Sequence, residues 1–139
     1  MLTEALPIYK DSEDLINTLL DCTKEFSKFF KYTFGEYMMK ECIELLRQIQ
    51  QANISTKNRV ENIENFLIQF NTIRATIRIC TERGEIGNAK AAQLAILTDK
   101  IGRQANGWRS KYMTEENKEK GKSGAFCTEE SEDKTEQPF

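Results

Sequence analysis

Histidine is absent from this 139-residue chain, and its cysteines are few and widely separated. Without histidine the chain lacks the commonest general base and the commonest transition-metal ligand of proteins. Zinc sites place their ligands in close pairs, a spacing that no two of the four cysteines have. They are Cys22, Cys42, Cys80 and Cys127. The sequence therefore predicts no metal, no cofactor and no histidine-based catalysis.

Other common signatures are also missing. The chain contains no P-loop, no dinucleotide-binding glycine pattern and no GxSxG turn, so we expect neither an enzyme nor a small-molecule substrate. No stretch approaches the roughly 18 apolar residues that cross a membrane, and no basic start followed by an apolar run opens the chain. Three cysteines fall on or beside apolar helical stripes, where reduced cysteine acts as a small hydrophobe. These features predict a cytoplasmic protein with no membrane partner.

Apolar residues, which make up 39% of the chain, recur at steps of three and four residues in four segments, as in helices with one buried face. We expect helices over 11–31, 33–52, 55 or 56 to 84, and from GEIGN to about 112. The scarcity of proline and glycine within these segments favours long helices. The sequence therefore predicts an all-α, up-down-up-down antiparallel four-helix bundle at residues 1–112. Residues 113–139 are polar and predict a disordered tail.

Three local signals refine these boundaries. Thr33 is expected to cap the second helix through its hydroxyl, with Glu36 reaching back to the Thr33 amide. Gly84 is expected to end the third helix in the left-handed conformation. Gly102 and Gly107 each cost about 1 kcal/mol relative to alanine inside a helix, which favours close approach of another helix. The second-helix stripe is expected to bury Met38, Met39, Cys42, Ile43, Leu45, Leu46 and Ile49.

Charge is unevenly distributed along the chain. The overall net charge of −2 hides a tail, residues 113–139, with a net charge of −4. Residues 24–112 carry 15 basic and nine acidic side chains, a net charge of +6. The body of the protein is therefore basic, which favours a polyanionic partner.

Basic side chains gather on the expected third and fourth helices. Lys100, Arg103 and Lys111 share one flank of the fourth helix with Gln104, where they would meet phosphates or merely complement the helix dipole and keep the surface soluble. Arg74 falls inside the apolar sector of the third helix, and Arg78 lies at its edge. Arg74 therefore needs an ion pair with a carboxylate such as Glu41, a stem that extends to water, or an interface with a subunit or nucleic acid. The candidate nucleic-acid-binding residues are Lys28, Lys31, Arg74, Arg78, Arg83, Lys100, Arg103, Arg109 and Lys111.

Several phrases of the sequence resemble the accessory variability determinant family of diversity-generating retroelements. This family belongs to a superfamily of four-helix proteins that includes ribosomal RNA intervening-sequence proteins. The matching phrases cover roughly residues 6–112 and are LPIYKDSEDLINTLLDCTKEFSKFFKYTFGEYMMKECIELL, NTIRATIRICTERGEI and IGRQANGW. The family's arginine pair corresponds to Arg74 and Arg78. Its Gly-Arg and Gly-Trp correspond to Gly102 with Arg103 and to Gly107 with Trp108.

The resemblance implies a homopentamer with a tapered, basic barrel shape and no catalytic role. It implies partnership with a reverse transcriptase and with template RNA or an RNA-DNA hybrid during adenine-directed mutagenic retrohoming. The alternatives are a protein-binding helical scaffold and a stand-alone intervening-sequence-type bundle with no retroelement role. Two features depart from the family: Gln104 and Ala105 replace larger apolar residues, and the acidic tail is additional. We hypothesise that this tail competes with RNA, which deletion of residues 113–139 would test.

Overall fold

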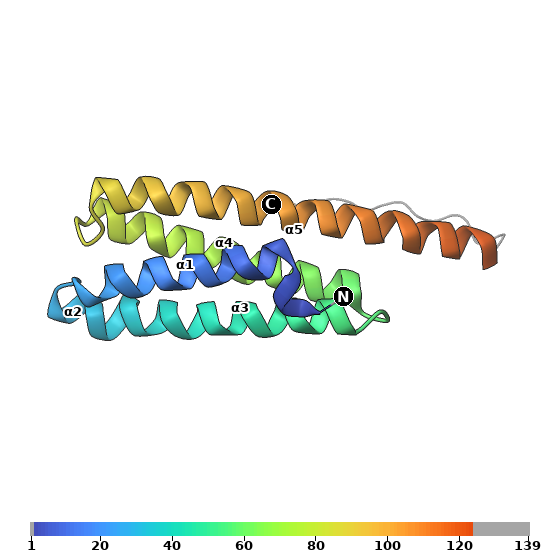
Figure 1. The fold of residues 1–139 in the computed structure, drawn as a ribbon, viewed down its shortest axis with the longest axis horizontal. Helices are drawn as coiled ribbons and strands as arrows, with labels where there is room; N and C mark the ends of the chain where they lie inside the picture. The colour runs from blue at the N-terminus through green and yellow to red at the C-terminus, as the bar shows by residue number, and fades with distance from the viewer. Residues whose placement is uncertain (1, 124–139) are drawn as a thin grey trace.

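The computed structural model describes residues 2–123, with side chains to residue 118, and all of its regular elements are helical. In chain order these are η1 (Thr3–Ala5), α1 (Pro7–Lys24), α2 (Lys28–Phe30), η2 (Lys31–Gly35), α3 (Glu36–Ile54), α4 (Arg59–Glu82) and α5 (Asn88–Ser123). η1 is a single 3-10 turn and η2 is a π-helical turn. Because α2, η2 and α3 follow one another without a gap, they form one long helix (Figure 1).

The long helices pack as an antiparallel bundle in which neighbours in sequence are also neighbours in space. α1 packs against α3 and α5, and α4 packs against the same two helices. The α1–α2 and α4–α5 links lie at one end of the bundle, on the left of Figure 1, and the α3–α4 link lies at the other. The predicted all-α, up-down-up-down four-helix bundle is confirmed.

The core is built from the apolar stripes that the sequence predicts. Leu15 and Leu19 of α1 and Phe70 of α4 are fully buried at its centre. The α3 stripe is correct at Met38, Cys42, Leu45 and Ile49 but wrong at Ile43, whose side chain is 62% exposed. Ile43 lies at the edge of the stripe, where it lines a groove between α1 and α3 instead of entering the core.

The first turn differs from the expectation. α1 ends at Lys24, and the next helix starts at Lys28, so the chain turns before Thr33. Thr33 is no cap: it lies inside the π-helical turn, and its hydroxyl donates to the carbonyl of Phe29 in α2 at 2.6 Å. The apolar periodicity is misleading here because Phe26 is buried even though it lies in the turn.

A residue distant in sequence fixes this turn. The amide and hydroxyl of Ser27 donate to the two carboxylate oxygens of Glu85, at 2.7 and 2.9 Å. Glu85 lies in the α4–α5 link, 58 positions further along the chain. Periodicity within one segment carries no information about such a contact, so the sequence alone misplaces the boundary.

The end of α4 is as predicted. Gly84 has a φ of 82°, in the left-handed region that favours glycine. The amide of Glu85 donates to the Cys80 carbonyl at 2.9 Å, and the amide of Gly84 donates to the Thr81 carbonyl at 3.1 Å. These two bonds form a Schellman motif, which satisfies carbonyls that the helix end would otherwise leave free.

Arg59, at the start of α4, joins three helices at the other end of the bundle. Its Nε donates to the Ala52 carbonyl at 2.6 Å, and its Nη2 donates to the Asn53 carbonyl at 2.8 Å. Its guanidinium also lies over the Tyr112 ring of α5, 4.6 Å from the ring centroid. One side chain thus caps the end of α3 and holds α5 against α4.

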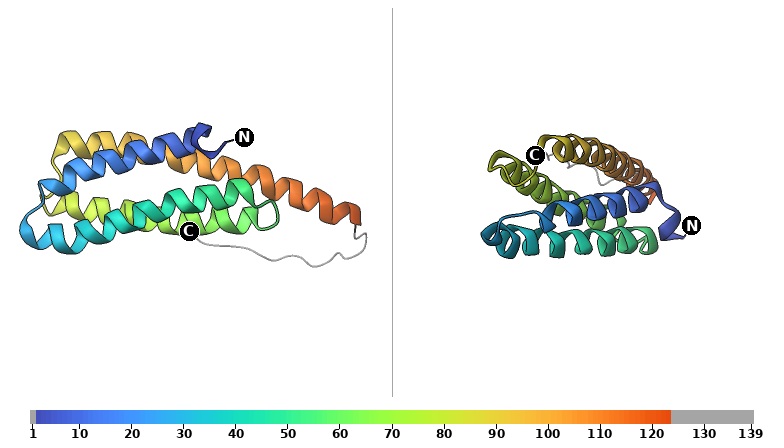
Figure 2. Two further views of the ribbon diagram at one scale, coloured as in Figure 1. Left: turned by 60° about the horizontal axis from the view of Figure 1, so that its bottom comes forward. Right: turned by 60° about the vertical axis from the view of Figure 1, so that its left-hand side comes forward.

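α5 does not end near Tyr112 as expected but continues as a helix to Ser123. Figures 1 and 2 show this helix running past the ends of the other three. Residues 113–123, which the sequence assigns to a disordered tail, are therefore helical instead. Residues 124–139 lie outside the described part of the chain.

Gly102 and Gly107 have different surroundings. A Cβ at Gly102 would lie 3.5 Å from Arg74 Nη1 and 3.6 Å from Phe70 Cε2, so α4 approaches this glycine closely. A Cβ at Gly107 would meet nothing within 4 Å in the part of the chain that the structure describes.

Replacing Gly107 by alanine is therefore expected to stabilise the isolated subunit by about 1 kcal/mol, the difference in helix propensity. Urea denaturation of Gly107→Ala at a fixed protein concentration measures the effect. Destabilisation instead would indicate that another subunit or a partner packs against this glycine.

Candidate nucleic-acid interface

Two of the nine candidate residues, Arg74 and Arg78, lie one turn apart on α4, and both are exposed. The guanidinium of Arg74 lies over the Phe70 ring, 5.8 Å from the centroid, and against Gly102 of α5. The ion pair with Glu41 that the sequence suggested for Arg74 does not form. Gln69 donates to Glu41 instead, at 2.6 Å. The charge of Arg74 therefore stays at the surface, held by an aromatic ring rather than by a carboxylate.

Three further candidates, Lys28, Lys31 and Arg83, lie at the end of the bundle that holds the α1–α2 and α4–α5 links. The Ser27–Glu85 contact brings this group together, because Lys28 follows Ser27 and Arg83 precedes Glu85 by two positions. Lys28 and Arg83 are exposed, and Lys31 is half-buried. None of the three has a carboxylate within ion-pair distance among residues 2–118.

Three of the four candidate cations on α5 pair with carboxylates. Lys100 pairs with Asp11 at 3.4 Å, and Arg103 pairs with Asp99 one turn earlier. The Nε and Nη2 of Arg109 both bind one carboxylate oxygen of Glu64, at 2.9 and 2.7 Å. Lys111 lies over the Tyr112 ring, 5.3 Å from its centroid, and has no carboxylate partner in the described chain.

Gln104, one of the two departures from the family, has a clear role here. Its amide donates to Asp11 Oδ2 at 2.6 Å, and Lys100 approaches Oδ1 of the same carboxylate. Asp11 thus links α1 to α5 through two side chains. Ala105, the second departure, is fully buried in the core.

The nine candidates therefore divide into three that are paired with carboxylates and six that are not. The paired residues are Lys100, Arg103 and Arg109. The flank of the fourth helix singled out from sequence retains only Lys111 without an acidic partner. Candidates without a carboxylate within ion-pair distance lie instead on α4 and around the α1–α2 link. Sequence spacing identified the basic residues but not their partners, because Asp11 and Glu64 belong to other helices.

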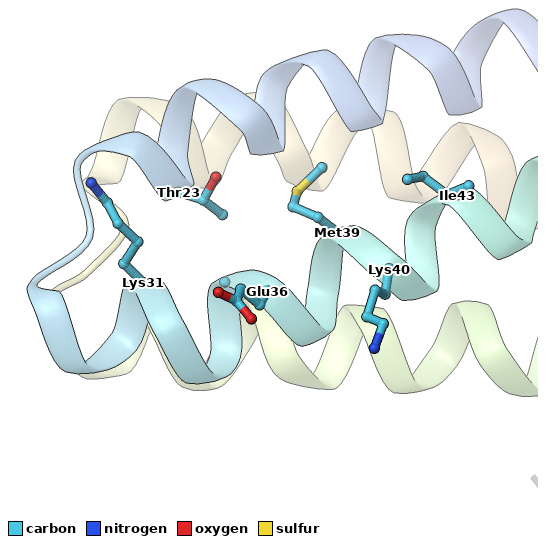
Figure 3. Close-up of a pocket in the computed structure, with 7 residues that line it drawn as sticks. Thr23, Lys31, Glu36, Met39, Lys40 and Ile43 are labelled. Atoms are coloured by element: carbon cyan, nitrogen blue, oxygen red, sulfur yellow. The ribbon is translucent and has the colours of Figure 1, made fainter.

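A shallow groove lies beside Lys31. Its volume is about 380 Å³, and α1, η2 and α3 form its walls. Figure 3 shows Lys31 at one end of it, with its ammonium pointing away from the Glu36 carboxylate. The residues that line the groove are Thr23, Lys31, Gly35, Glu36, Met39, Lys40 and Ile43.

Two surface aromatic residues were missed from sequence. Phe29 is 68% exposed and Tyr32 is 60% exposed. They were missed because apolar periodicity alone does not distinguish exposed rings from the buried rings nearby. The alternation of lysine and aromatic residues in KFFKY was the available signal. Trp108, by contrast, is half-buried and packs against the core.

The three cysteines in the described chain are free thiols buried in the bundle. Burial raises the pKa of Cys42 to about 12 and that of Cys80 to about 11. They therefore pack as small hydrophobes, as predicted. Within residues 2–118, no group of three acidic or cysteine side chains could hold a metal ion. No helix in the described region has the length and hydrophobicity needed to span a bilayer.

Comparison with known proteins gives one match. The model of the bAvd-like family matches residues 6–112. Neither curated proteins nor solved structures gave a match to the chain. The matched region begins at the residue before α1 and ends at Tyr112, where Arg59 holds α5 to the bundle. Because the match covers more than half of the sequence and the whole four-helix bundle, the chain belongs to the bAvd-like family.

Proposed function

We propose that this protein is a non-catalytic accessory factor of a diversity-generating retroelement and acts in the cytoplasm during mutagenic retrohoming. The observation that carries the proposal is the bAvd-like match over residues 6–112. The partners proposed on this basis are a reverse transcriptase and template RNA, or an RNA-DNA hybrid formed from it. A homopentamer is the proposed assembly.

The charge distribution supports nucleic-acid binding. Six candidates have no carboxylate within ion-pair distance in the described chain, and five of them lie on α4 or beside the α1–α2 and α4–α5 links: Lys28, Lys31, Arg74, Arg78 and Arg83. A guanidinium or ammonium that is not paired with a carboxylate is available to phosphates without breaking an existing ion pair. Lys100, Arg103 and Arg109 must first release their carboxylates, so we assign them a smaller share of the affinity.

We expect the full-length protein to bind structured RNA with little dependence on sequence and a steep dependence on salt. Five phosphate contacts correspond to a slope of about −4 in log affinity against log salt for each bound protomer. Fluorescence anisotropy with a labelled stem-loop RNA at several salt concentrations measures this slope. Absence of binding at low salt would contradict the nucleic-acid part of the proposal.

A protein-binding scaffold is the second candidate, and exposed aliphatic side chains favour it. Leu20, Ile43 and Ile96 are exposed on α1, α3 and α5, and each lines a groove beside α1. Copurification with the reverse transcriptase without any affinity for RNA would support this alternative. Analytical ultracentrifugation tests the homopentamer separately.

A further inference from the structure

Two large aromatic side chains project from the surface at the start of the long second helix. Phe29 and Tyr32 are both more than half exposed, and Lys28 and Lys31 each precede one of them in sequence. We call these four residues the aromatic-basic turn. Residues three apart on a helix lie on neighbouring positions of its surface, so the two rings share one side of this turn.

The Phe29 ring is held in place although it is exposed. It meets the Phe30 ring edge-on at 5.6 Å, and Phe30 in turn packs against Phe34 at 5.2 Å. Phe30 and Phe34 both pack against the hydrophobic core. The bond from the Thr33 hydroxyl to the Phe29 carbonyl fixes the backbone beneath the ring. A ring supported in this way offers a stacking surface that loses little freedom on binding.

The backbone around the turn is also specialised. Residues 31–35 form a π-helical turn, a rare geometry that is frequent at functional sites. The Ser27–Glu85 contact anchors the start of the turn to the α4–α5 link. Neither lysine of the turn has a carboxylate within ion-pair distance in the described chain.

We propose that the aromatic-basic turn binds single-stranded RNA, with bases stacking on Phe29 and Tyr32 and phosphates contacting Lys28 and Lys31. Sites for single strands combine aromatic rings, which accept any base, with cations that follow the backbone. The inference rests on the proposed function for its partner class. It goes further by naming the residues and by requiring unpaired bases, because bases stacked within a duplex cannot pack on protein rings.

A protein is the alternative partner for this surface, but the composition of the surface favours RNA. Aromatic residues are enriched in both kinds of interface, whereas lysine is depleted at the centre of protein–protein interfaces. Here two lysines alternate with the two exposed rings. We therefore assign the turn to nucleic acid and treat a protein partner as an outcome of the test.

The test compares the full-length protein with a Phe29→Leu/Tyr32→Leu double variant, which keeps apolar side chains and both lysines. Anisotropy is measured with an unstructured oligouridine and with an RNA duplex of equal length. We expect the variant to lose affinity for the single strand by about tenfold or more, since each stacked base contributes several-fold. Affinity for the duplex is expected to stay within about twofold. Tyr37→Leu, at an exposed tyrosine of α3 outside the turn, is the matched control and should change neither.

Equal single-strand affinity of the double variant and the wild type would overturn the inference while leaving the proposed function intact. A variant that keeps its RNA affinity but no longer copurifies with the reverse transcriptase would overturn it in favour of a protein partner. If wild-type protein bound neither RNA, the proposed function itself would fail.

Should circular dichroism show that the double variant does not fold, the variant Lys28→Gln/Lys31→Gln replaces it. That variant is expected to reduce the salt slope for the single strand by about 1.5, and an unchanged slope would overturn the inference.

Discussion

Replacement of both Arg74 and Arg78 by glutamate is expected to weaken RNA binding by about 100-fold near physiological salt. These arginines have no carboxylate partner in the described chain, so their charge is fully available to phosphates. Each reversal exchanges an attraction for a repulsion and changes the affinity by on the order of tenfold, or about 1.4 kcal/mol. Anisotropy with the labelled stem-loop RNA measures the change.

The control must change net charge equally without touching the proposed interface. Lys10→Glu/Lys57→Glu does so, because both lysines are exposed and lie on α1 and in the α3–α4 link. A loss in this control as large as in the α4 variant would mean that net charge alone governs binding. Because Arg74 packs on Phe70, Arg78→Glu alone is also measured, to separate charge from packing. About a tenfold loss is expected for that single change.

Replacing Arg59 by methionine is expected to destabilise the bundle by about 2–3 kcal/mol. The change removes two charge-assisted hydrogen bonds to carbonyls at the end of α3 and the contact with the Tyr112 ring. Hydrogen bonds to charged groups contribute about 1.5–3 kcal/mol each, and partial exposure of this side chain reduces their sum. Methionine keeps the apolar stem, so the loss reports on the guanidinium. Urea denaturation at one protein concentration gives the free energy of unfolding.

Two further variants serve as controls for the Arg59→Met result. Lys57→Met removes an exposed cation from the α3–α4 link, two positions before Arg59, and is expected to change stability by no more than about 0.5 kcal/mol. Tyr112→Leu keeps both Arg59 hydrogen bonds and removes the ring that Arg59 and Lys111 contact, for which we expect a loss of about 1 kcal/mol or less. If Arg59→Met were no worse than Lys57→Met, the guanidinium would not hold the helices together as the geometry indicates.

The architecture was predictable because helix periodicity is a local property of the sequence. Leu15, Leu19 and Phe70 follow steps of three and four residues, and all are buried. The end of α4 was also predictable from a local signal, since only glycine readily adopts the φ of 82° that Gly84 has. The start of the second long helix depends on a distant residue, because Glu85 fixes it through Ser27. The predicted Thr33 cap was therefore wrong.

The candidate site was less predictable than the fold because the availability of a basic side chain depends on which carboxylates pair with it in the folded protein. Lys100 and Arg109 appeared as free as Arg78 on a helical wheel, yet their carboxylates lie on α1 and α4. Asp11 and Gln104 are 93 positions apart in sequence and still form a hydrogen bond. Similarly, periodicity placed Ile43 in the core, whereas it lies exposed at the edge of a groove.

The extended α5 helix has two parts that are stabilised by different interactions. Up to Tyr112 it is stabilised by packing against α1 and α4 and by the Arg59 contact. Its last part runs past the ends of the other helices (Figure 2), so within the described chain its own backbone hydrogen bonds and side-chain propensities favour the helix there. Isolated helices shorter than about 12–15 residues are marginal in water. This distal arm is consequently the part of α5 whose helix–coil equilibrium a neighbouring molecule can shift most easily, with little energetic consequence for the bundle behind it.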